Sequence, residues 1–183
     1  MEISTQMTYD NFLKYFLYSQ KKIKAIYRAI GIIFIILAVS DAVSCLFEPL
    51  VIDDLIIDIA FIVSLLVIGI LFLVLIDRIL TNAASKAYHS NKFIATNPVF
   101  TFQFNKNNYK VLVTSPMGIE ECTYSYDMIY SIVETDNFIY IKIGNNSAYI
   151  INKIQENIEN LNKIITFLRD EKQINYIVDI KKK

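Results

Sequence analysis

Few side chains in the sequence have the types and spacing that catalysis requires. There is one histidine, His89, and there are two cysteines, Cys45 and Cys122. A lone histidine makes neither a metal cluster nor the base of a nucleophilic pair, and two thiols are too few for a structural zinc site. We therefore expect His89 to lie on a helix surface and each cysteine to serve as a small apolar residue.

Other motifs that carry chemistry are also missing. Glu120 and Glu121 are adjacent, so in a strand their carboxylates point to opposite faces and cannot share a site. The four glycines exclude most phosphate-cradling loops, and no Gly-x-x-x-x-Gly-Lys motif is present. Tyr124, Tyr126 and Tyr130 have no basic stripe beside them and the net charge is zero, which favours sheet packing over base stacking. The sequence predicts a non-enzymatic protein with no cofactor, no metal and no nucleic-acid partner.

The stretch from Ile59 to Ile76 (IAFIVSLLVIGILFLVLI) has no charge and no proline. At about 1.5 Å per residue, a helix of this length crosses most of a roughly 30 Å hydrocarbon layer. The alternative is a core helix of a soluble protein, but such a helix is usually shorter and keeps one polar face. We interpret the stretch as a transmembrane helix.

A second hydrophobic stretch, Ala29 to Phe47, is interrupted only by Asp41 and predicts another span. A cleaved signal is the alternative, although the region before it is too long and Asp41 disrupts the cleavage box around Cys45. The connection from Glu48 to Asp54 has no Lys or Arg, whereas basic residues precede the first span and follow the second. The positive-inside rule then predicts a cell-membrane protein with two spans and both termini in the cytoplasm.

Two sets of charged residues flank the predicted spans, one acidic and one basic. The outer surface would be wholly acidic, which is either merely tolerated there or forms a receptor face for a cation or cationic peptide. The inner side would be basic, which either only fixes the orientation or binds anionic lipid. The acidic residues are Asp41, Glu48, Asp53, Asp54 and Asp58, and the basic candidates for lipid contact are Lys21, Lys22, Lys24 and Arg28.

The segments on either side of the spans have their own patterns. In residues 1–28, Thr8 can cap a helix with Asp10 in its first turn, and aromatic residues recur near helical spacing up to Tyr27. After the second span, residues 77–97 continue as helix until Asn97-Pro98 stops it.

The remaining chain alternates in the manner of a sheet. Polar turns separate about six short antiparallel strands, and an apolar stripe from Ile154 to Leu168 predicts a helix that covers the sheets. The expected strands are Phe100–Phe104, Tyr109–Thr114, Ile119–Tyr124, Met128–Thr135, Phe138–Ile143 and Ala148–Ile151. Ile174 to Ile180 can add an edge strand or dock on the membrane, and Lys181 to Lys183 suit anionic headgroups.

We therefore divide the chain into five segments. They are a basic-aromatic juxtamembrane segment (1–28), two transmembrane helices with a short acidic external loop (29–76), a connecting helix (77–97), a β domain with a C-terminal helix (98–171) and a basic tail (172–183). The fold class is an α+β membrane protein.

A family resemblance rests mainly on the run from Gly118 to Lys153 (MGIEECTYSYDMIYSIVETDNFIYIKIGNNSAYIINK, with Met117). The run has a glycine turn, an aromatic strand leading to a Tyr-x-Asp-hydrophobic step, a Val-Glu-Thr strand and a Tyr-Ile-Ile strand. This pattern, together with the early Tyr9-x-x-Phe12, resembles the YcxB-like membrane proteins of bacteria. The resemblance implies a cytoplasmic domain like a pleckstrin-homology (PH) barrel and implies no catalytic residue. Asn152 departs from it, because the family often has proline before the lysine that is Lys153 here.

Two functions follow as hypotheses. The first is a membrane-anchored binding or regulatory module that presents its PH-like domain to a protein or lipid partner at the inner leaflet. The second is an immunity or transport accessory protein that acts through the helical hairpin and the acidic loop on a cationic peptide or ion. The spans lack a Gly-x-x-x-Gly motif, so the sequence does not predict an oligomeric state.

Overall fold

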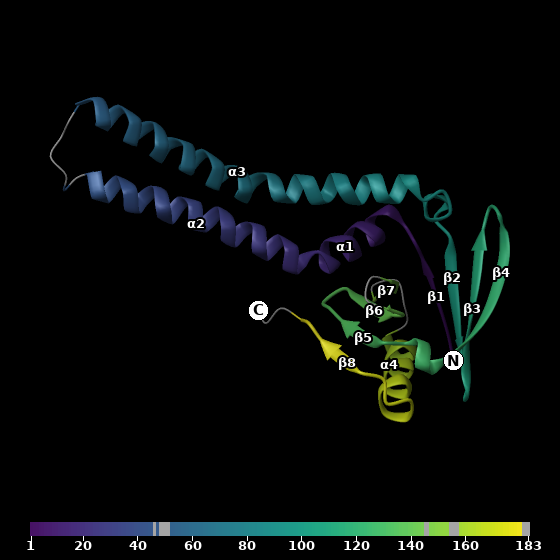
Figure 1. Ribbon diagram of the computed structural model, residues 1–183. Helices are drawn as coiled ribbons and strands as arrows, with labels where there is room; N and C mark the ends of the chain where they lie inside the picture. Colours follow the sequence, from purple (N-terminus) through teal and green to yellow (C-terminus); the bar gives the residue numbers. More distant parts are fainter. Residues whose placement is uncertain (46, 48–51, 145–146, 154–157, 181–183) are drawn as a thin grey trace. The chain divides into compact units, whose positions relative to one another are not determined.

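The computed structural model describes residues 1–45, 47, 52–144, 147–153 and 158–180, with only the backbone of residues 52–55 (Figure 1). The chain forms two compact units. The first, which we call the β unit, comprises Met1–Phe16 and Ser85–Lys183, and the second, the hairpin unit, comprises Leu17–Ala84. The chain therefore begins in the β unit, forms the hairpin unit and returns to the β unit.

Two long helices, α2 (Lys21–Cys45) and α3 (Ile52–Ser90), dominate the hairpin unit. Both are long and apolar enough to cross a membrane, by length and composition. Only 11% of the residues in the most apolar window of each helix are buried, whereas a core helix of a soluble protein is mostly buried. The outward apolar surface is consistent with a membrane location and argues against the soluble-core alternative.

The helices extend beyond the predicted spans. α2 already begins at Lys21, and α3 continues past Ile76 to Ser90 without a break, so the expected connecting helix is its last part. The helix ends at Ser90, earlier than the predicted stop at Asn97-Pro98, and a short 3-10 turn, η1 (Ile94–Thr96), lies between its end and Asn97. Asn97 takes the left-handed conformation (φ 53°) that asparagine tolerates, and its N–H closes this turn on the Ile94 carbonyl at 3.0 Å.

The two helices approach each other closely at a pair of glycines. A Cβ atom added at Gly31 would lie 2.9 Å from the Gly69 carbonyl oxygen, and one added at Gly69 would lie 2.9 Å from the Gly31 carbonyl oxygen and 2.8 Å from Ile35 Cγ1. No real Cβ fits at such distances, so hydrogen is the only side chain that this contact admits. Small residues allow helices to approach in this way in membranes, where apolar lipid supplies no hydrophobic drive for helix association.

The β unit contains two four-stranded sheets. Sheet A is antiparallel and has the order β1 (Glu2–Gln6), β2 (Val99–Phe104), β3 (Asn108–Ser115) and β4 (Gly118–Ser125). Sheet B has the order β7 (Ala148–Asn152), β6 (Phe138–Lys142), β5 (Ser131–Glu134) and β8 (Tyr176–Val178), with β5 and β8 parallel. Helix α4 (Ile158–Thr166) follows β7 and continues into a π-helical turn, η3 (Phe167–Glu171).

One hydrophobic core joins these elements. Phe102 and Val111 contribute from sheet A, Ile132 and Ile139 from sheet B, and α4 adds Leu161, Ile164 and Ile165. Tyrosines complete the core, and burial raises the pKa of Tyr126 and of Tyr149 to about 12, so both phenols stay uncharged at neutral pH. The α+β class and the capping helix are confirmed. The sheets share no backbone ladder among the described residues, so they do not close into a barrel.

Residues 2–6 form strand β1, an element that the interpretation of residues 1–28 as a basic-aromatic segment did not include. Ile3 and Thr5 are buried while Glu2, Ser4 and Gln6 are exposed, an alternation that is visible in the sequence but short. The helix predicted to begin after Thr8 is confirmed as α1 (Tyr9–Ser19), with the Asn11 N–H donating to Thr8 Oγ1 at 3.3 Å. It breaks at Gln20 instead of continuing to Tyr27.

Of the two alternatives for Ile174 to Ile180, the structure contains the edge strand. β8 extends sheet B beside β5, with Ile177 opposite Val133. The pairing is parallel, unlike the antiparallel strands that were expected. Lys181 to Lys183 lie outside the described residues.

The glycine contact gives a first prediction. Gly69→Leu should lower the stability of the hairpin unit by about 1–3 kcal/mol, because the added side chain overpacks the contact with Gly31 and Ile35. The measurement is the thermal aggregation midpoint of the detergent-solubilised protein. Ala60→Leu, at an exposed position of α3, is the matched control and should leave the midpoint unchanged. Equal midpoints for the two variants would contradict this packing.

Candidate binding sites

The predicted acidic face is partly assembled in the hairpin unit. Asp41 of α2 and Asp58 of α3 line one pocket of about 260 Å³, together with Ser44, Cys45 and Phe61. Both carboxylates are half-buried. Asp53 and Asp54 belong to the first turn of α3, where only the backbone is described, and Glu48 lies outside the described residues. The structure thus brings together two of the five predicted acidic residues.

The predicted basic residues divide into two groups. The side chains of Lys24 and Arg28 both bind the Asp77 carboxylate of α3, with 3.0 Å between Arg28 Nη2 and Asp77 Oδ2. The ammonium of Lys21 lies 4.7 Å from the centre of the Tyr18 ring, and Lys22 is exposed. Two of the four expected lipid contacts therefore also hold α2 to α3.

Sequence reasoning missed the role of Asp77. The available signal was that Asp77 directly follows the second apolar stretch, whereas Lys24 and Arg28 precede the first. In a helical hairpin these two ends lie side by side. Because Asp77 is one carboxylate between two cations, it neutralises only one of them. One positive charge therefore remains in the cluster of Lys24, Arg28 and Asp77.

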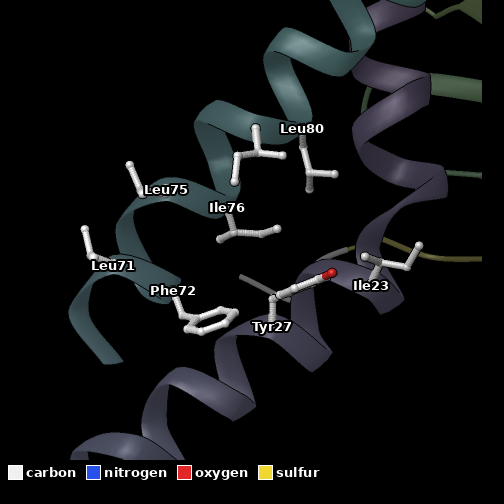
Figure 2. Close-up of a pocket in the computed structure, with 8 residues that line it drawn as sticks. Ile23, Tyr27, Leu71, Phe72, Leu75, Ile76 and Leu80 are labelled. Carbon is white, nitrogen blue, oxygen red and sulfur yellow. The ribbon is translucent and has the colours of Figure 1, made fainter. Parts of the chain in front are cut away.

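An apolar groove borders this cluster within the hairpin unit (Figure 2). Its volume is about 390 Å³, and its walls include Ile23 and Tyr27 of α2 and Phe72, Ile76 and Leu80 of α3. The Tyr27 and Phe72 rings stack with 5.9 Å between their centres. Every lining side chain is hydrocarbon except for the Tyr27 hydroxyl, so this groove suits an apolar chain.

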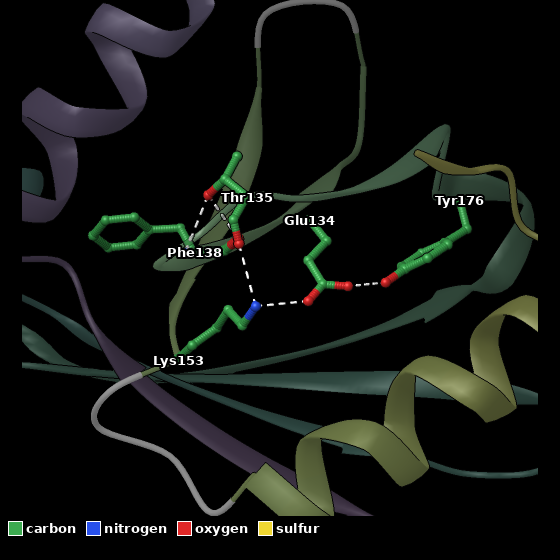
Figure 3. Close-up of polar contacts among 5 residues, drawn as sticks. All are labelled: Glu134, Thr135, Phe138, Lys153 and Tyr176. Atoms are coloured by element: carbon green, nitrogen blue, oxygen red, sulfur yellow. Dashed lines mark hydrogen bonds and ion pairs between the residues drawn. The ribbon is translucent and has the colours of Figure 1, made fainter. Parts of the chain in front are cut away.

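A polar network holds the C-terminal strand of the β unit (Figure 3). The Tyr176 hydroxyl of β8 donates to Glu134 of β5, and the Lys153 ammonium donates to Glu134 Oε1 at 2.6 Å and to the Thr135 carbonyl at 3.2 Å. The side chains of Glu134 and Lys153 are 17% and 25% exposed, so their ion pair is shielded from solvent. Each of these side chains has a partner, so the network holds β8 beside β5.

β4 is the outermost strand of sheet A and is exposed along its length except at half-buried Tyr124. Ser115 pairs with Gly118 across the two-residue turn. The pair that closes such a turn is hydrogen-bonded and the pairs then alternate, so Ile119, Glu121 and Thr123 direct their N–H and C=O groups away from β3. Lys110 pairs with Glu121 at 2.7 Å, whereas Glu120 has no ion pair among the described residues.

The other residues singled out in the sequence have packing or surface positions. His89 is exposed near the end of α3, as predicted, and its ring stacks on Tyr9 with 6.1 Å between the centres. Tyr126 packs against Tyr109 in the core, and its hydroxyl donates to the Asn105 carbonyl at 2.7 Å. Tyr130 is 65% exposed, so it does not pack in the sheet.

The hydrogen bond between Tyr176 and Glu134 in Figure 3 gives a prediction about the stability of β8. Tyr176→Phe removes the hydrogen bond to Glu134, which contributes about 1 kcal/mol, so the backbone amides of β8 should exchange with solvent about fivefold faster. Hydrogen exchange followed by mass spectrometry measures this rate. Tyr130→Phe, at an exposed phenol, is the control. Unchanged exchange in Tyr176→Phe would mean that the hydroxyl does not hold the strand.

Comparison with known proteins agrees with the resemblance seen in the sequence. No curated protein and no solved structure matches the chain. One family model, described as YcxB-like protein, matches residues 118–168. The match begins at the first residue of β4 and continues through β5, β6, β7 and α4 into η3. It also contains the run from Gly118 to Lys153 on which the resemblance was based. The expected resemblance to the YcxB-like family is thereby confirmed over residues 118–168.

Proposed function

We propose that this protein is a membrane-anchored, non-enzymatic binding module of the bacterial cell membrane. In this proposal α2 and α3 cross the bilayer, both termini lie in the cytoplasm, and the β unit presents the open edge of β4 to a partner protein at the inner leaflet. The exposed edge of β4, which pairs with β3 alone among the described residues, is the observation that carries the proposal, since such an edge can accept an added strand.

The pairing of β1 with β2 supports a common side for the two ends of the hairpin. β1 precedes the hairpin unit and β2 follows it, yet they form one ladder from Glu2–Gln103 to Gln6–Val99. The Met7 N–H donates to the Pro98 carbonyl at 2.9 Å and extends this contact. A single folded unit lies in one compartment, so the chain has to return to the side from which it entered. The lack of Lys and Arg between the spans favours the cytoplasm for that side.

The parts of a PH-like domain are present in the β unit. Two four-stranded sheets enclose a core that α4 covers. We propose that they form an open sandwich of PH-like kind. Two strands depart from the expected PH-like domain: β1, which precedes α2 and α3 in the chain, and β8, which is parallel to β5.

The chemistry of β4 indicates the kind of partner. Its two carboxylates lie on opposite faces, and Glu120 has no ion pair among the described side chains. The strand has no lysine or arginine. An extended segment with basic side chains would add backbone hydrogen bonds at the edge and place its charges near Glu120.

A second candidate function rests on the pocket shared by Asp41 and Asp58. Two half-buried carboxylates that face one cavity at the outer end of a hairpin form a site for a cation or a cationic peptide. This arrangement supports the alternative of an immunity or transport accessory protein, in which the β unit serves as scaffold.

The edge-strand proposal is tested with a strand-forming peptide of alternating valine and lysine and the full-length chain in detergent. Deletion of residues 1–90 would remove β1, so the whole chain is needed. Thr123→Pro removes an outward N–H and should weaken binding by at least about tenfold, because proline at a strand edge blocks strand addition. Thr123→Ala keeps the N–H and should bind as the unmodified chain does. Equal binding by Thr123→Pro and Thr123→Ala would refute this proposal.

The second candidate is tested with a soluble basic peptide added to the outside of intact cells. Asp41→Asn and Asp58→Asn should each reduce its binding, since each removes one of the two charges of the pocket. Glu171→Gln, in the β unit, is a control with the same loss of charge. Binding that is unchanged in both aspartate variants would eliminate this candidate.

A further inference from the structure

We propose that the groove between α2 and α3 binds one anionic phospholipid, with an acyl chain along the groove and the headgroup phosphate at the Lys24–Arg28–Asp77 cluster. The proposal rests on the membrane location proposed above. It assigns a specific lipid site to the hairpin unit, which is distinct from the protein-binding edge of β4.

The position of the groove beside the cluster is the first argument. On α2 the groove-lining residues Ile23 and Tyr27 directly precede Lys24 and Arg28, and on α3 Ile76 directly precedes Asp77. The apolar walls drawn in Figure 2 and the charged groups therefore come from the same helix turns. A phospholipid has this arrangement, with a hydrocarbon chain joined to a charged headgroup.

Charge complementarity indicates the headgroup class. The cluster has two cations and one carboxylate, and the side chains of Lys24 and Arg28 remain 30% and 49% exposed despite their ion pairs. A zwitterionic headgroup brings no net charge to compensate the remaining cation, whereas an anionic one does. Asp77 meanwhile holds both basic side chains at the groove, so they are positioned before a lipid arrives.

The shape of the groove favours a single chain. Its volume is about 390 Å³, and the stacked rings of Tyr27 and Phe72 form part of its wall. The Tyr27 hydroxyl, the one polar group among the lining side chains, comes from the same α2 turn as Arg28. This hydroxyl can donate to a phosphate or ester oxygen of a bound lipid.

The chain has no tryptophan, so the fluorescence of a single introduced tryptophan comes from one known position. Phe72→Trp places the reporter in the groove, and Val74→Trp places it two residues away, at a 61% exposed position that does not line the groove. Each variant is reconstituted into phosphatidylcholine vesicles that contain the same small fraction of brominated phosphatidylglycerol or brominated phosphatidylcholine. Bromine quenches tryptophan only at close range.

The Phe72→Trp signal should give an apparent affinity about fivefold higher for the brominated anionic lipid than for the brominated zwitterionic one, while Val74→Trp should not distinguish them. Adding Lys24→Gln to Phe72→Trp should abolish the preference, because the Arg28–Asp77 pair remains and the excess charge is lost. Lys24→Arg should retain it.

Equal quenching of Phe72→Trp by both lipids would overturn the lipid site, as would a preference that survives Lys24→Gln. A different result would contradict the proposed membrane location. If the hairpin does not enter the bilayer, neither lipid quenches Val74→Trp, and this outcome contradicts the proposed function as well.

Discussion

The outward apolar surface of α2 and α3 is the constraint on which the rest of the structure depends. Side chains such as Ile36 and Val74, each 61% exposed, would face water in a soluble protein. The hydrophobic effect penalises that exposure in water by roughly 25 cal/mol per Å², so the surface is consistent with apolar surroundings. The two helices then need other means of association, which the Gly31–Gly69 contact and the ion pairs of Asp77 provide.

The β unit is coupled to the hairpin unit by the order of the chain. Its first strand precedes the two helices and its other strands follow them, so sheet A is complete only after the hairpin has been made. Thr5 Oγ1 donates to the Ile150 carbonyl of β7 at 2.7 Å, and Asn160 Nδ2 donates to the Glu2 carbonyl at 2.7 Å. β1 thus links sheet A to sheet B and to α4. The hairpin unit is therefore inserted within the sequence of the β unit instead of being appended to one end of it.

Local patterns predicted much of this fold from the sequence. Alternation between Phe100 and Phe104 and the turns at Asn105 and Pro116 gave strands that agree with β2 to β4 within one or two residues, and the apolar stripes gave α4 and both long helices. What the sequence left open depends on contacts between distant segments. β1 is short and finds its partner almost a hundred residues later, and β8 is parallel to a strand far from it in the chain. The same holds for the site, since the sequence placed Asp41 and Asp58 on one acidic surface but did not show the pocket that they share or the ion pair between Asp77 and Arg28.

The most direct test of the account is the sidedness of the two ends of the hairpin, because the accessible edge of β4, the acidic pocket and the lipid groove all take their surroundings from it. Cys122 is exposed on β4, and a membrane-impermeant thiol reagent can report its compartment in intact cells after Cys45→Ser. A second variant that lacks both native cysteines and has Glu48→Cys reports on the connection between the spans. We expect Glu48→Cys to be labelled in intact cells and Cys122 to be labelled only after the membrane is permeabilised. Labelling of Cys122 from outside, or protection of Glu48→Cys in intact cells, would contradict this sidedness.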